Sequence, residues 1–576
     1  MMQLFDPASR RVSLSLTFSP ERSVEGSAVE KAGVEVLRKI IFVAGLLVLD
    51  ACSGAADSYS PGGGGSQSSL PALAVTLAAS SQNAEATDET PALLILNASY
   101  TGDPAGVVVP DVQVTDSAVA LDGPIGRSGN TFTVKLKATA PLALGSYSGT
   151  VSFRLCRDQN CTEVYPGSTQ KFSYAIDSRL ADWTTLQRNA AHTGYVRARF
   201  DPAKFAQTWQ VDLSSTESFG RVAVSRDAVV AVSLNRESGN YTAHCYDLAS
   251  GRERWRRIFK AGDVIGDPGI AGDAIALTAA KAKPADDDGR TWSNALLFLR
   301  PADGEIRASV DYEGADANMF APTTIADELL LAGGPSVAGS VGNRVYSFDV
   351  SSHAQRWIGT GSGNGFGKGQ TPAADADYVY HYSGSLDVFR RDTGARVSST
   401  DDPGFRALSR AFSGAPVVSS RKSVIAYSGE VTRPYFPETR LVSYNTESGR
   451  VNWTSAATYF QAPAVANGTI YAVSRDRKRI DALNEATGQV QWSIVAGVAE
   501  SGYPVSNVIV TDNLIFFSTE NRVYAVTVAA PHAEIWSAPV SGQLAISPDG
   551  QLIVSGRLPS NGSGLDQPRI TAFQLR

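Results

Sequence analysis

A short pattern of fixed spacing recurs through the second half of the chain and restricts the fold to a repeat architecture. In its clearest copies a polar residue ends an apolar strand, a glycine follows four positions later, and a tryptophan follows four positions after the glycine. These copies are Asp247–Gly251–Trp255, Asn445–Gly449–Trp453 and Asn484–Gly488–Trp492. Each copy predicts a hairpin, because glycine accepts the positive φ of a tight turn. Such self-similarity is typical of proteins built from repeated supersecondary units.

Weaker copies of the pattern fill the intervals between the clear ones. The tryptophan-equivalent positions are 209, 255, 308, 357, 398, 453, 492 and 536, and Trp209, Trp255, Trp357, Trp453, Trp492 and Trp536 are tryptophans. Neighbouring positions lie roughly 40 to 55 residues apart, which is typical of four-stranded propeller blades. A second pattern, two short apolar runs around a polar turn as in Pro463–Ser474, precedes each hairpin and gives the same count. The sequence therefore predicts an all-β fold with an eight-bladed β-propeller over residues 183–576.

One copy of the pattern is divided between the two ends of the repeat region. The strand that carries the tryptophan lies at Thr208–Leu213, and the strand that should precede it lies at Ile570–Leu575. We expect these two strands to pair, because such a pair would close the ring and remove its last open edge.

The N-terminal region reads as an export signal. Ile40–Leu49 is apolar but too short to span a bilayer, so residues 1–51 are interpreted as a signal peptide region, with 1–35 reflecting a misassigned start. The sequence that ends at Cys52 resembles a bacterial lipobox, although Asp50 departs from the usual small or apolar residue. We expect lipidation of Cys52, and Ser53 after it implies the outer membrane. The alternative is a cytosolic chain in which the apolar run is a buried strand.

Two further segments separate the signal from the repeats. Residues 52–69 are rich in glycine and serine and predict a flexible, lipidated tether. Residues 70–178 contain alternating runs spaced by turn residues, which predicts an immunoglobulin-like β-sandwich. Cys156 and Cys161 flank a short polar loop in this region. We expect them to form a disulfide in an exported protein, while a metal site, the alternative, lacks further Cys or His ligands nearby.

The hairpin copies and the lead-in segment Asp182–Val196 resemble the pyrroloquinoline-quinone-like (PQQ-like) propeller repeats, in which an apolar strand precedes aspartate, threonine–glycine and tryptophan. This quinoprotein-like family divides between quinone-dependent dehydrogenases and non-catalytic lipoproteins that act as scaffolds. The dehydrogenases carry a disulfide of adjacent cysteines over the quinone and a bound calcium ion. This chain has no adjacent cysteine pair, and Cys245 is expected to be a small buried residue. The sequence therefore predicts neither PQQ nor calcium.

The remaining residues offer no catalytic cluster. The five histidines are scattered without paired spacing: His192, His244, His353, His381 and His532. A structural hydrogen bond is the expected role of His192 in the lead-in segment. The net charge of −6 gives no indication of a basic nucleic-acid-binding face. We therefore predict no catalytic residues, no metal ligands and no nucleic-acid partner.

Two loops are candidates for partner binding. Lys368 lies in the glycine-rich stretch Gly359–Gly369, which could contact a small ligand or peptide or could be a plain linker. Arg433, Tyr435 and Phe436 lie together on a proline-flanked loop, a composition enriched at interface cores. The alternative is that Tyr435 and Phe436 pack back on their own blade.

These features together predict a non-enzymatic, lipid-anchored envelope protein on the periplasmic face of the outer membrane, with cell-surface exposure left open. The resemblance implies envelope-protein partners, with the outer-membrane β-barrel assembly machine as the candidate, held by loops or by strand addition at blade edges. Two alternatives remain, a PQQ-dependent dehydrogenase and a lipoprotein that binds surface glycans or other ligands.

Overall fold

The computed structural model describes residues 70–576 except 140–141, 285–291, 315–320, 335, 338–339, 342, 363–370, 405–414, 420–422, 429–438, 475–478, 496–503 and 559–566. Within these ranges every regular element is a β-strand, apart from one 3₁₀ turn at Pro202–Lys204. Ser69–Arg576 form one compact unit. Nowhere in the described ranges is there a helix long and apolar enough to cross a membrane. The fold class is therefore all-β, as the sequence predicts.

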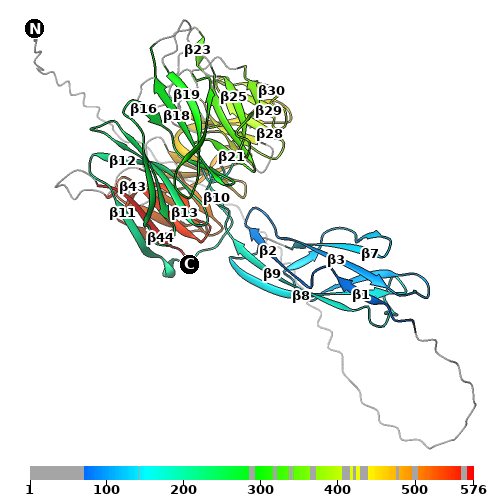
Figure 1. The fold of residues 1–576 in the computed structure, drawn as a ribbon. Helices are drawn as coiled ribbons and strands as arrows, with labels where there is room; N and C mark the ends of the chain where they lie inside the picture. Colours follow the sequence, from blue (N-terminus) through cyan, green and yellow to red (C-terminus); the bar gives the residue numbers. More distant parts are fainter. Residues whose placement is uncertain are drawn as a thin grey trace, which may run out of the picture. The chain divides into compact units, whose positions relative to one another are not determined.

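Two sheets occupy the part of the chain between residues 74 and 179 (Figure 1). The first has the order β1 (Ala74–Leu77), β3 (Leu93–Thr101), β7 (Thr131–Ala138) and β5 (Val119–Leu121), with β6 (Gly126–Ser128) also on β7. The second has the order β2 (Ser81–Thr87), β9 (Gln170–Arg179), β8 (Gly145–Cys156) and β4 (Val109–Val114). Neighbouring strands are antiparallel except β2 and β9, which are parallel.

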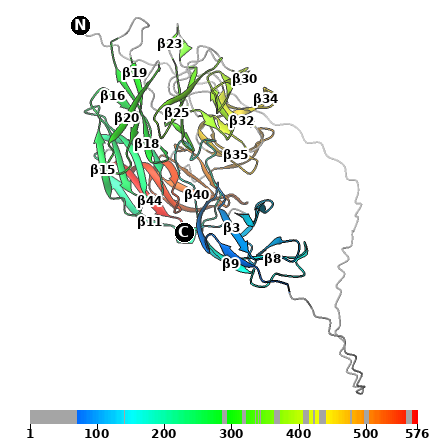
Figure 2. The ribbon, with the colours of Figure 1, turned by 45° about the vertical axis from the view of Figure 1, so that its right-hand side comes forward.

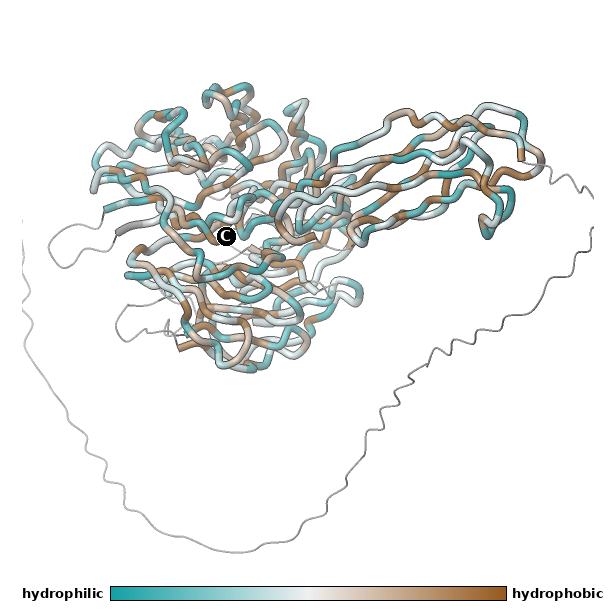
Figure 3. The backbone as a smooth tube through the Cα atoms, turned by 90° about the horizontal axis from the view of Figure 1, so that it is seen from below, coloured by the Kyte–Doolittle hydropathy of each residue, from teal (hydrophilic) through white to brown (hydrophobic). Residues whose placement is uncertain are grey.

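Alternation of apolar and polar residues gives these two sheets a shared core. Every second side chain of β3 is buried, and Figure 3 shows hydrophobic and hydrophilic residues alternating along the strands. The shared core includes Leu94, Leu96, Phe132, Val134, Phe153 and Phe172. The alternating runs of the sequence coincide with β1, β3, β4, β7, β8 and β9. They missed β2, β5 and β6, because alanines are the only apolar residues of β2 and the other two strands are very short.

Seven sheets of four or more strands follow between residues 195 and 574 in the described ranges (Figures 1 and 2). Three of them are β12 (Glu217–Val224), β13 (Ala228–Asn235), β14 (Tyr241–Asp247) and β15 (Glu253–Ile258); β16 (Asp263–Ile265), β17 (Gly269–Ala271), β18 (Ala274–Ala282), β19 (Trp292–Leu299) and β20 (Ile306–Tyr312); and β21 (Thr323–Ile325), β22 (Glu328–Gly333), β25 (Arg344–Asp349) and β26 (Gln355–Thr360). A separate short pair comprises β23 (Ser336–Val337) and β24 (Ser340–Val341).

The other four sheets complete the region. The fourth sheet has β27 (Ala373–Ala374), β28 (Tyr378–Tyr382), β29 (Ser385–Arg390) and β30 (Arg396–Asp401), and the fifth has β31 (Val417–Val418), β32 (Ser423–Ser428), β33 (Arg440–Asn445), β34 (Arg450–Ala466), β35 (Thr469–Ser474), β36 (Ile480–Asn484) and β37 (Val490–Ile494). The sixth has β10 (Tyr195–Val196), β38 (Ile509–Thr511), β39 (Leu514–Ser518), β40 (Val523–Thr527) and β41 (Glu534–Ala538). The seventh has β11 (Ala206–Asp212), β44 (Gln567–Gln574), β43 (Gln551–Leu558) and β42 (Ser541–Ile546). The long strand β34 is shared by two four-stranded runs, β31 to β34 and β34 to β37.

The two ends of the repeat region pair with each other. Strand β11 lies antiparallel to β44, with Trp209 opposite Ala572 and Val211 opposite Ile570. This pairing was predicted from the divided copy of the sequence pattern, and the structure confirms it. The chain therefore completes its last four-stranded sheet with its first repeat strand.

The repeated tryptophans connect each sheet to the next one. The indole Nε1 of Trp209 donates a hydrogen bond to the carbonyl oxygen of Leu248 over 2.8 Å, and Trp453 does the same to Glu485 over 2.9 Å. Trp255 and Trp357 make the equivalent bonds to Pro301 and Arg391. In each case the ring covers the glycine of the neighbouring hairpin turn. Trp209 covers Gly251, Trp255 covers Gly304, Trp357 covers Gly394 and Trp453 covers Gly488.

Histidine replaces glycine in two of these turns. His353 and His532 have φ of 58° and 59°, a left-handed conformation matching that of the glycines. The ring of His532 stacks on Trp492 with centroids 3.6 Å apart, whereas His353 packs against Phe298. Trp536 has no continuous hairpin to cover, because that hairpin is divided between β44 and β11, and it packs against Phe205 and Phe573 instead.

Candidate functional site

Residues 180–198, which contain the lead-in segment Asp182–Val196, form hydrogen bonds to all seven of the described propeller sheets, either to a strand or to a residue directly beside one. Its main-chain and hydroxyl partners follow the chain order of the sheets and are Val224, Ile270, Pro322, Ala374, Val418, Val465, Val510 and Pro548. The sequence identified this segment as part of the family pattern but gave no indication of these contacts. One segment therefore links all seven sheets along the strands at or beside these contacts. We call these strands the inner strands, and they are β12, β17, β21, β27, β31, β34, β38 and β42.

Gln187 is a buried side chain of the lead-in segment with three hydrogen bonds to residues far away in the sequence. Its Nε2 donates to the carbonyl oxygens of Pro463 and Val508, at 2.7 and 3.1 Å, and its Oε1 accepts from Asn507 Nδ2 at 2.7 Å. The backbone of Gln187 is left-handed, with φ of 52°. Because the side chain is buried, these three bonds hold two neighbouring sheets at a point closed to water.

His192 is a buried structural residue, as the sequence predicted. Its Nδ1 lies 2.9 Å from the carbonyl oxygen of Pro416, so the nitrogen carries the proton and donates. Burial lowers the pKa of His192 to about 4 from 6.5, although the bond to Pro416 acts in the opposite direction. The imidazole is therefore neutral at pH 7 and is committed to holding the sheet that begins at β31.

Arg188 joins the lead-in segment to the turn between β2 and β3. Its guanidinium pairs with Asp88 at 2.5 Å, and both side chains are almost completely buried. Asp88 also accepts hydrogen bonds from the backbone N–H groups of Ala181 and Arg197. The carboxylate is thus compensated by one cation and two amides, as a buried charge requires.

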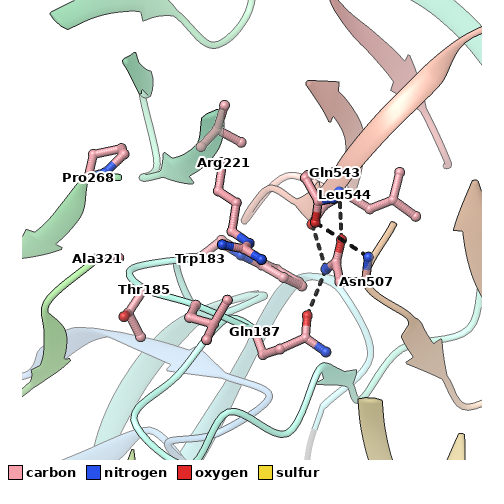
Figure 4. A pocket seen from close by; sticks show the side chains of 11 residues that line it. Trp183, Thr185, Gln187, Arg221, Pro268, Ala321, Asn507, Gln543 and Leu544 are labelled. Carbon is pink, nitrogen blue, oxygen red and sulfur yellow. Dashed lines mark hydrogen bonds between the residues drawn. The ribbon is translucent and has the colours of Figure 1, made fainter. Parts of the chain in front are cut away.

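A small cavity lies where the lead-in segment meets the inner strands (Figure 4). Figure 4 shows Trp183 and Arg221 on one side, with Gln187, Asn507 and Gln543 linked by hydrogen bonds on the other. Its volume is about 10 Å³, which is room for about one water molecule. This cavity cannot hold an organic ligand.

A much larger hollow lies between β12 and the sheet of β42 to β44. Its volume is about 410 Å³, within the range of small-ligand and peptide sites. Glu217, Phe219, Arg236 and Gln543 contribute a carboxylate, an aromatic ring, a guanidinium and an amide to its wall. Gly542 and Gly556 also line it, and a Cβ at Gly542 would lie 2.3 Å from the backbone oxygen of Ser555, so only glycine fits there. The mixture of groups suits a polar chain segment better than an apolar molecule.

The structure brings together Ser233, His244 and Glu253, which the sequence did not connect. Ser233 Oγ lies 2.9 Å from His244 Nε2, and His244 Nδ1 lies 2.8 Å from Glu253 Oε1. Burial lowers the pKa of His244, and Glu253 opposes that shift. This is the bonding order of a serine–histidine–acid triad, but Ser233 and His244 are only 1 % and 2 % exposed. No substrate carbonyl can reach the hydroxyl, so the three residues form a polar network inside the sheet.

Cys156 and Cys161 lie at disulfide distance, with their Cα atoms 5.0 Å apart. The carboxylate of Asp111 lies within 4.8 Å of both sulfur atoms. The sequence gave no indication of this contact, because Asp111 precedes Cys156 by 45 positions. Asp111 is already paired with Arg154 at 2.6 Å. Cys245, the other described cysteine, is buried in β14, and burial raises the pKa of its thiol to about 11.

Several predicted residues lie outside the described ranges. They are the lipidation residue Cys52 and the candidate partner-binding residues Lys368, Arg433, Tyr435 and Phe436. Their roles stay predictions. The structure therefore directs attention to the hollow at Glu217 and Arg236, which combines residues of two sheets and has no signature in the sequence.

Comparison with known proteins identifies the repeat region. The profile of the family described as outer membrane protein assembly factor BamB matches residues 192–364, 289–494 and 382–543. Among solved structures, BamB from Moraxella catarrhalis is 17 % identical and covers 64 % of this chain and 99 % of its own, with a TM-score of 0.43.

Two other solved structures are also similar. The comparison with curated proteins gives no match. The WD40 β-propeller domain of Doa1 is 10 % identical and covers 65 % of this chain and 97 % of its own, with a TM-score of 0.35. Hsv2 from Kluyveromyces lactis is 8 % identical and covers 55 % and 98 %, with a TM-score of 0.34. Because the family profile spans more than half of the chain, the protein belongs to the PQQ-like β-propeller repeat family of the outer membrane protein assembly factor BamB.

Proposed function

We propose that this protein is a non-catalytic scaffold of the bacterial envelope, which binds protein partners during outer-membrane protein assembly. The observation that carries the proposal is the family match over residues 192–543. Its partners are envelope proteins, with components of the β-barrel assembly machine as the first candidates.

The architecture that we propose is a closed eight-bladed propeller preceded by an immunoglobulin-like sandwich. Counting β34 twice, as the last strand of one blade and the first of the next, gives eight units of four or five strands. The pairing of β11 with β44 and the contacts of residues 180–198 with every sheet support ring closure. The two sheets between residues 74 and 179, which share one core, support the sandwich.

The anchor in this proposal is an acyl group on Cys52, placed on the periplasmic face of the outer membrane. The lipobox-like sequence supports it, and the cysteine pair Cys156 and Cys161, with a disulfide in an oxidising compartment, agrees with export. Mass spectrometry of the mature N-terminus provides the test. Acylated Cys52 as the first residue is expected, and a mature chain that retains residues before Cys52 would overturn the anchor.

Binding is proposed over quinone chemistry because the sequence lacks the adjacent cysteine pair of the quinone-dependent dehydrogenases. The cavity at Trp183, where the lead-in segment meets the inner strands, has a volume of about 10 Å³ and would not admit a three-ring quinone. The hollow at Glu217, Phe219 and Arg236 is large enough for a peptide segment and offers both charges and a ring. We place the partner contact there.

Site-specific photocrosslinking in living cells tests the scaffold proposal. A photoreactive residue at Arg236, on the wall of the hollow, is compared with one at Arg252, an exposed arginine between β14 and β15 of the same sheet. Mass spectrometry should find outer-membrane assembly components crosslinked to position 236 and not to position 252. Another envelope protein at position 236, or equal yields at both positions, would overturn this assignment.

A further inference from the structure

The two sheets between residues 74 and 179 present different faces to solvent. On the outer face of β3, Leu93 and Ile95 are 57 % and 50 % exposed. Each lies directly opposite a lysine of β7, with Leu93 beside Lys137 and Ile95 beside Lys135. We call these four residues the aliphatic–lysine face. Two large aliphatic side chains and two cations thus lie side by side on adjacent strands.

No carboxylate accompanies these residues on the outward positions of the sheet's described strands. The other outward positions of β1, β3, β5 and β7 are Ala74, Thr76, Asn97, Ser99, Thr101, Ala120, Thr131 and Thr133. Directly after β5, Asp122 is exposed and donates its backbone N–H to the carbonyl oxygen of Lys135, so one carboxylate lies beside this face. Lys135 and Lys137 outnumber it, in a chain with a net charge of −6. Lysine stems are also aliphatic and extend the apolar surface.

The outer face of the second sheet has the opposite character. Its outward positions carry no large aliphatic side chain, and several of its charged groups are paired, as in Arg154 with Asp111 and Arg179 with Glu85. None of the large exposed hydrophobic residues of the described chain lies on β2, β4, β8 or β9. Both sheets share one core, so packing does not require the exposed aliphatic residues of the first sheet.

The short distance in sequence between Cys52 and β1 favours a membrane as the surface that binds the aliphatic–lysine face. The first sheet begins at β1, about twenty residues after Cys52, and β1 pairs directly with β3. A glycine- and serine-rich segment of that length has a mean span of roughly 25 Å. An acylated Cys52 would therefore hold this sheet close to the lipid surface. Local tethering raises the effective concentration enough for a weak patch to bind.

We propose that the aliphatic–lysine face binds the surface of an anionic phospholipid membrane. Leu93 and Ile95 enter the boundary between headgroups and acyl chains, and Lys135 and Lys137 contact the anionic headgroups. The location of the face beside the membrane rests on the anchor of the proposed function, but its lipid-binding chemistry does not.

Vesicle flotation tests this inference without the acyl group. The chain from Ser53 onward keeps the compact unit Ser69–Arg576 whole. It is mixed with vesicles of phosphatidylethanolamine and phosphatidylglycerol, or with vesicles of phosphatidylcholine alone. We expect binding to the anionic vesicles, which falls as salt is added, and little binding to the neutral ones.

Single substitutions separate this face from general charge effects. Lys135→Glu and Lys137→Glu should each weaken binding roughly tenfold, and Leu93→Ser or Ile95→Ser roughly fivefold. Lys171→Glu makes the same charge change on an exposed position of β9 and should leave binding unchanged. Thermal unfolding of each variant checks that the fold is intact.

Equal binding to both kinds of vesicle, or an equal loss from Lys171→Glu, would overturn the inference. A partner protein that protects Lys135 from chemical labelling in the absence of lipid would also overturn it. The result is independent of the scaffold proposal, because crosslinking at Arg236 should persist in the Lys135→Glu variant.

Discussion

The propeller sheets are tied together in two different ways, one at the tryptophan hairpins and one at the lead-in segment. Each tryptophan joins only two neighbouring sheets, by covering a hairpin turn and bonding to one carbonyl oxygen, as Trp453 does over Gly488. Residues 180–198 join all of the described sheets through one continuous segment. The first tie is repeated and local, and the second is unique.

The tryptophan is absent from two of the repeats, which shows that the turn conformation and the indole contact are separable. Ala308 and Ser398 stand where other copies have tryptophan, yet the turns that they would cover keep a left-handed residue, at His353 and Gly449. The turn conformation therefore does not depend on the indole. No second copy of the lead-in segment exists to replace a lost contact, so we expect losses there to be larger.

The largest effect is expected from Gln187→Ala. The substitution removes three buried hydrogen bonds and leaves the groups of Pro463, Val508 and Asn507 without this partner. The free energy of unfolding should fall by about 4 kcal/mol. Urea unfolding followed by tryptophan fluorescence measures it, with Gln210→Ala on the exposed side of β11 as the control. If Gln187→Ala lowered the free energy of unfolding no more than the disruption of a single tryptophan hairpin does, the lead-in segment would not connect the sheets more strongly than one hairpin.

Acid should weaken the lead-in tie through His192. The folded protein holds the pKa of His192 at about 4, whereas the unfolded chain titrates near 6.5. The unfolded state therefore binds more protons below pH 6.5, and stability present at pH 7 is lost as the pH falls toward 4. The contribution is about 3 kcal/mol.

His192→Asn supplies the control for that pH dependence. Asparagine tolerates the positive φ at this position, and its amide can donate to Pro416. The variant should show a flatter loss of stability between pH 6.5 and 4. Burial also lowers the pKa of His244 and His381, so part of the acid sensitivity should remain. An unchanged pH profile would show that His192 does not titrate on unfolding.

The sequence predicted what is periodic and missed what is not. Fixed spacing revealed the tryptophans, the turn glycines and the pairing of Thr208–Leu213 with Ile570–Leu575, which the structure confirms. Gln187 and Val508 are 321 residues apart, and no spacing rule connects them. The lead-in contacts could be found only once the sheets were placed around them.

The candidate site shows the same limit more strongly. Ser233, His244 and Glu253 come from three adjacent strands, and diagonal neighbours across a sheet have no fixed sequence spacing. The hollow at Glu217 and Arg236 draws on strands from both ends of the repeat region. The residues that composition did suggest for partner binding, Lys368 and the loop of Tyr435, lie outside the described ranges.

A smaller effect is expected where an alanine replaces a turn glycine under tryptophan. A Cβ at Gly488 would lie 2.4 Å from Trp453 Cε3, so Gly488→Ala must displace the ring as well as strain a backbone with φ of 69°. Gly449→Ala imposes similar backbone strain, but its nearest contact is Thr400 Oγ1 at 3.7 Å. We expect the free energy of unfolding to fall by about 2 to 3 kcal/mol in Gly488→Ala and by about 1 kcal/mol in Gly449→Ala. Equal losses in urea unfolding would mean that the indole adjusts freely.

The smallest effect is expected from His532→Gly, which separates turn conformation from ring contact. Glycine relieves the left-handed strain at φ of 59° but loses the stacking on Trp492, and each contribution is about 1 kcal/mol. The two changes should nearly cancel in the free energy of unfolding. His532→Ala loses the stacking without relieving the strain, so it should cost about 1 kcal/mol more than His532→Gly in the same urea titration. If the two variants were equally stable, positive φ would not be what selects the residue at this turn, and the glycines of the other turns would be explained by the space under their tryptophans alone.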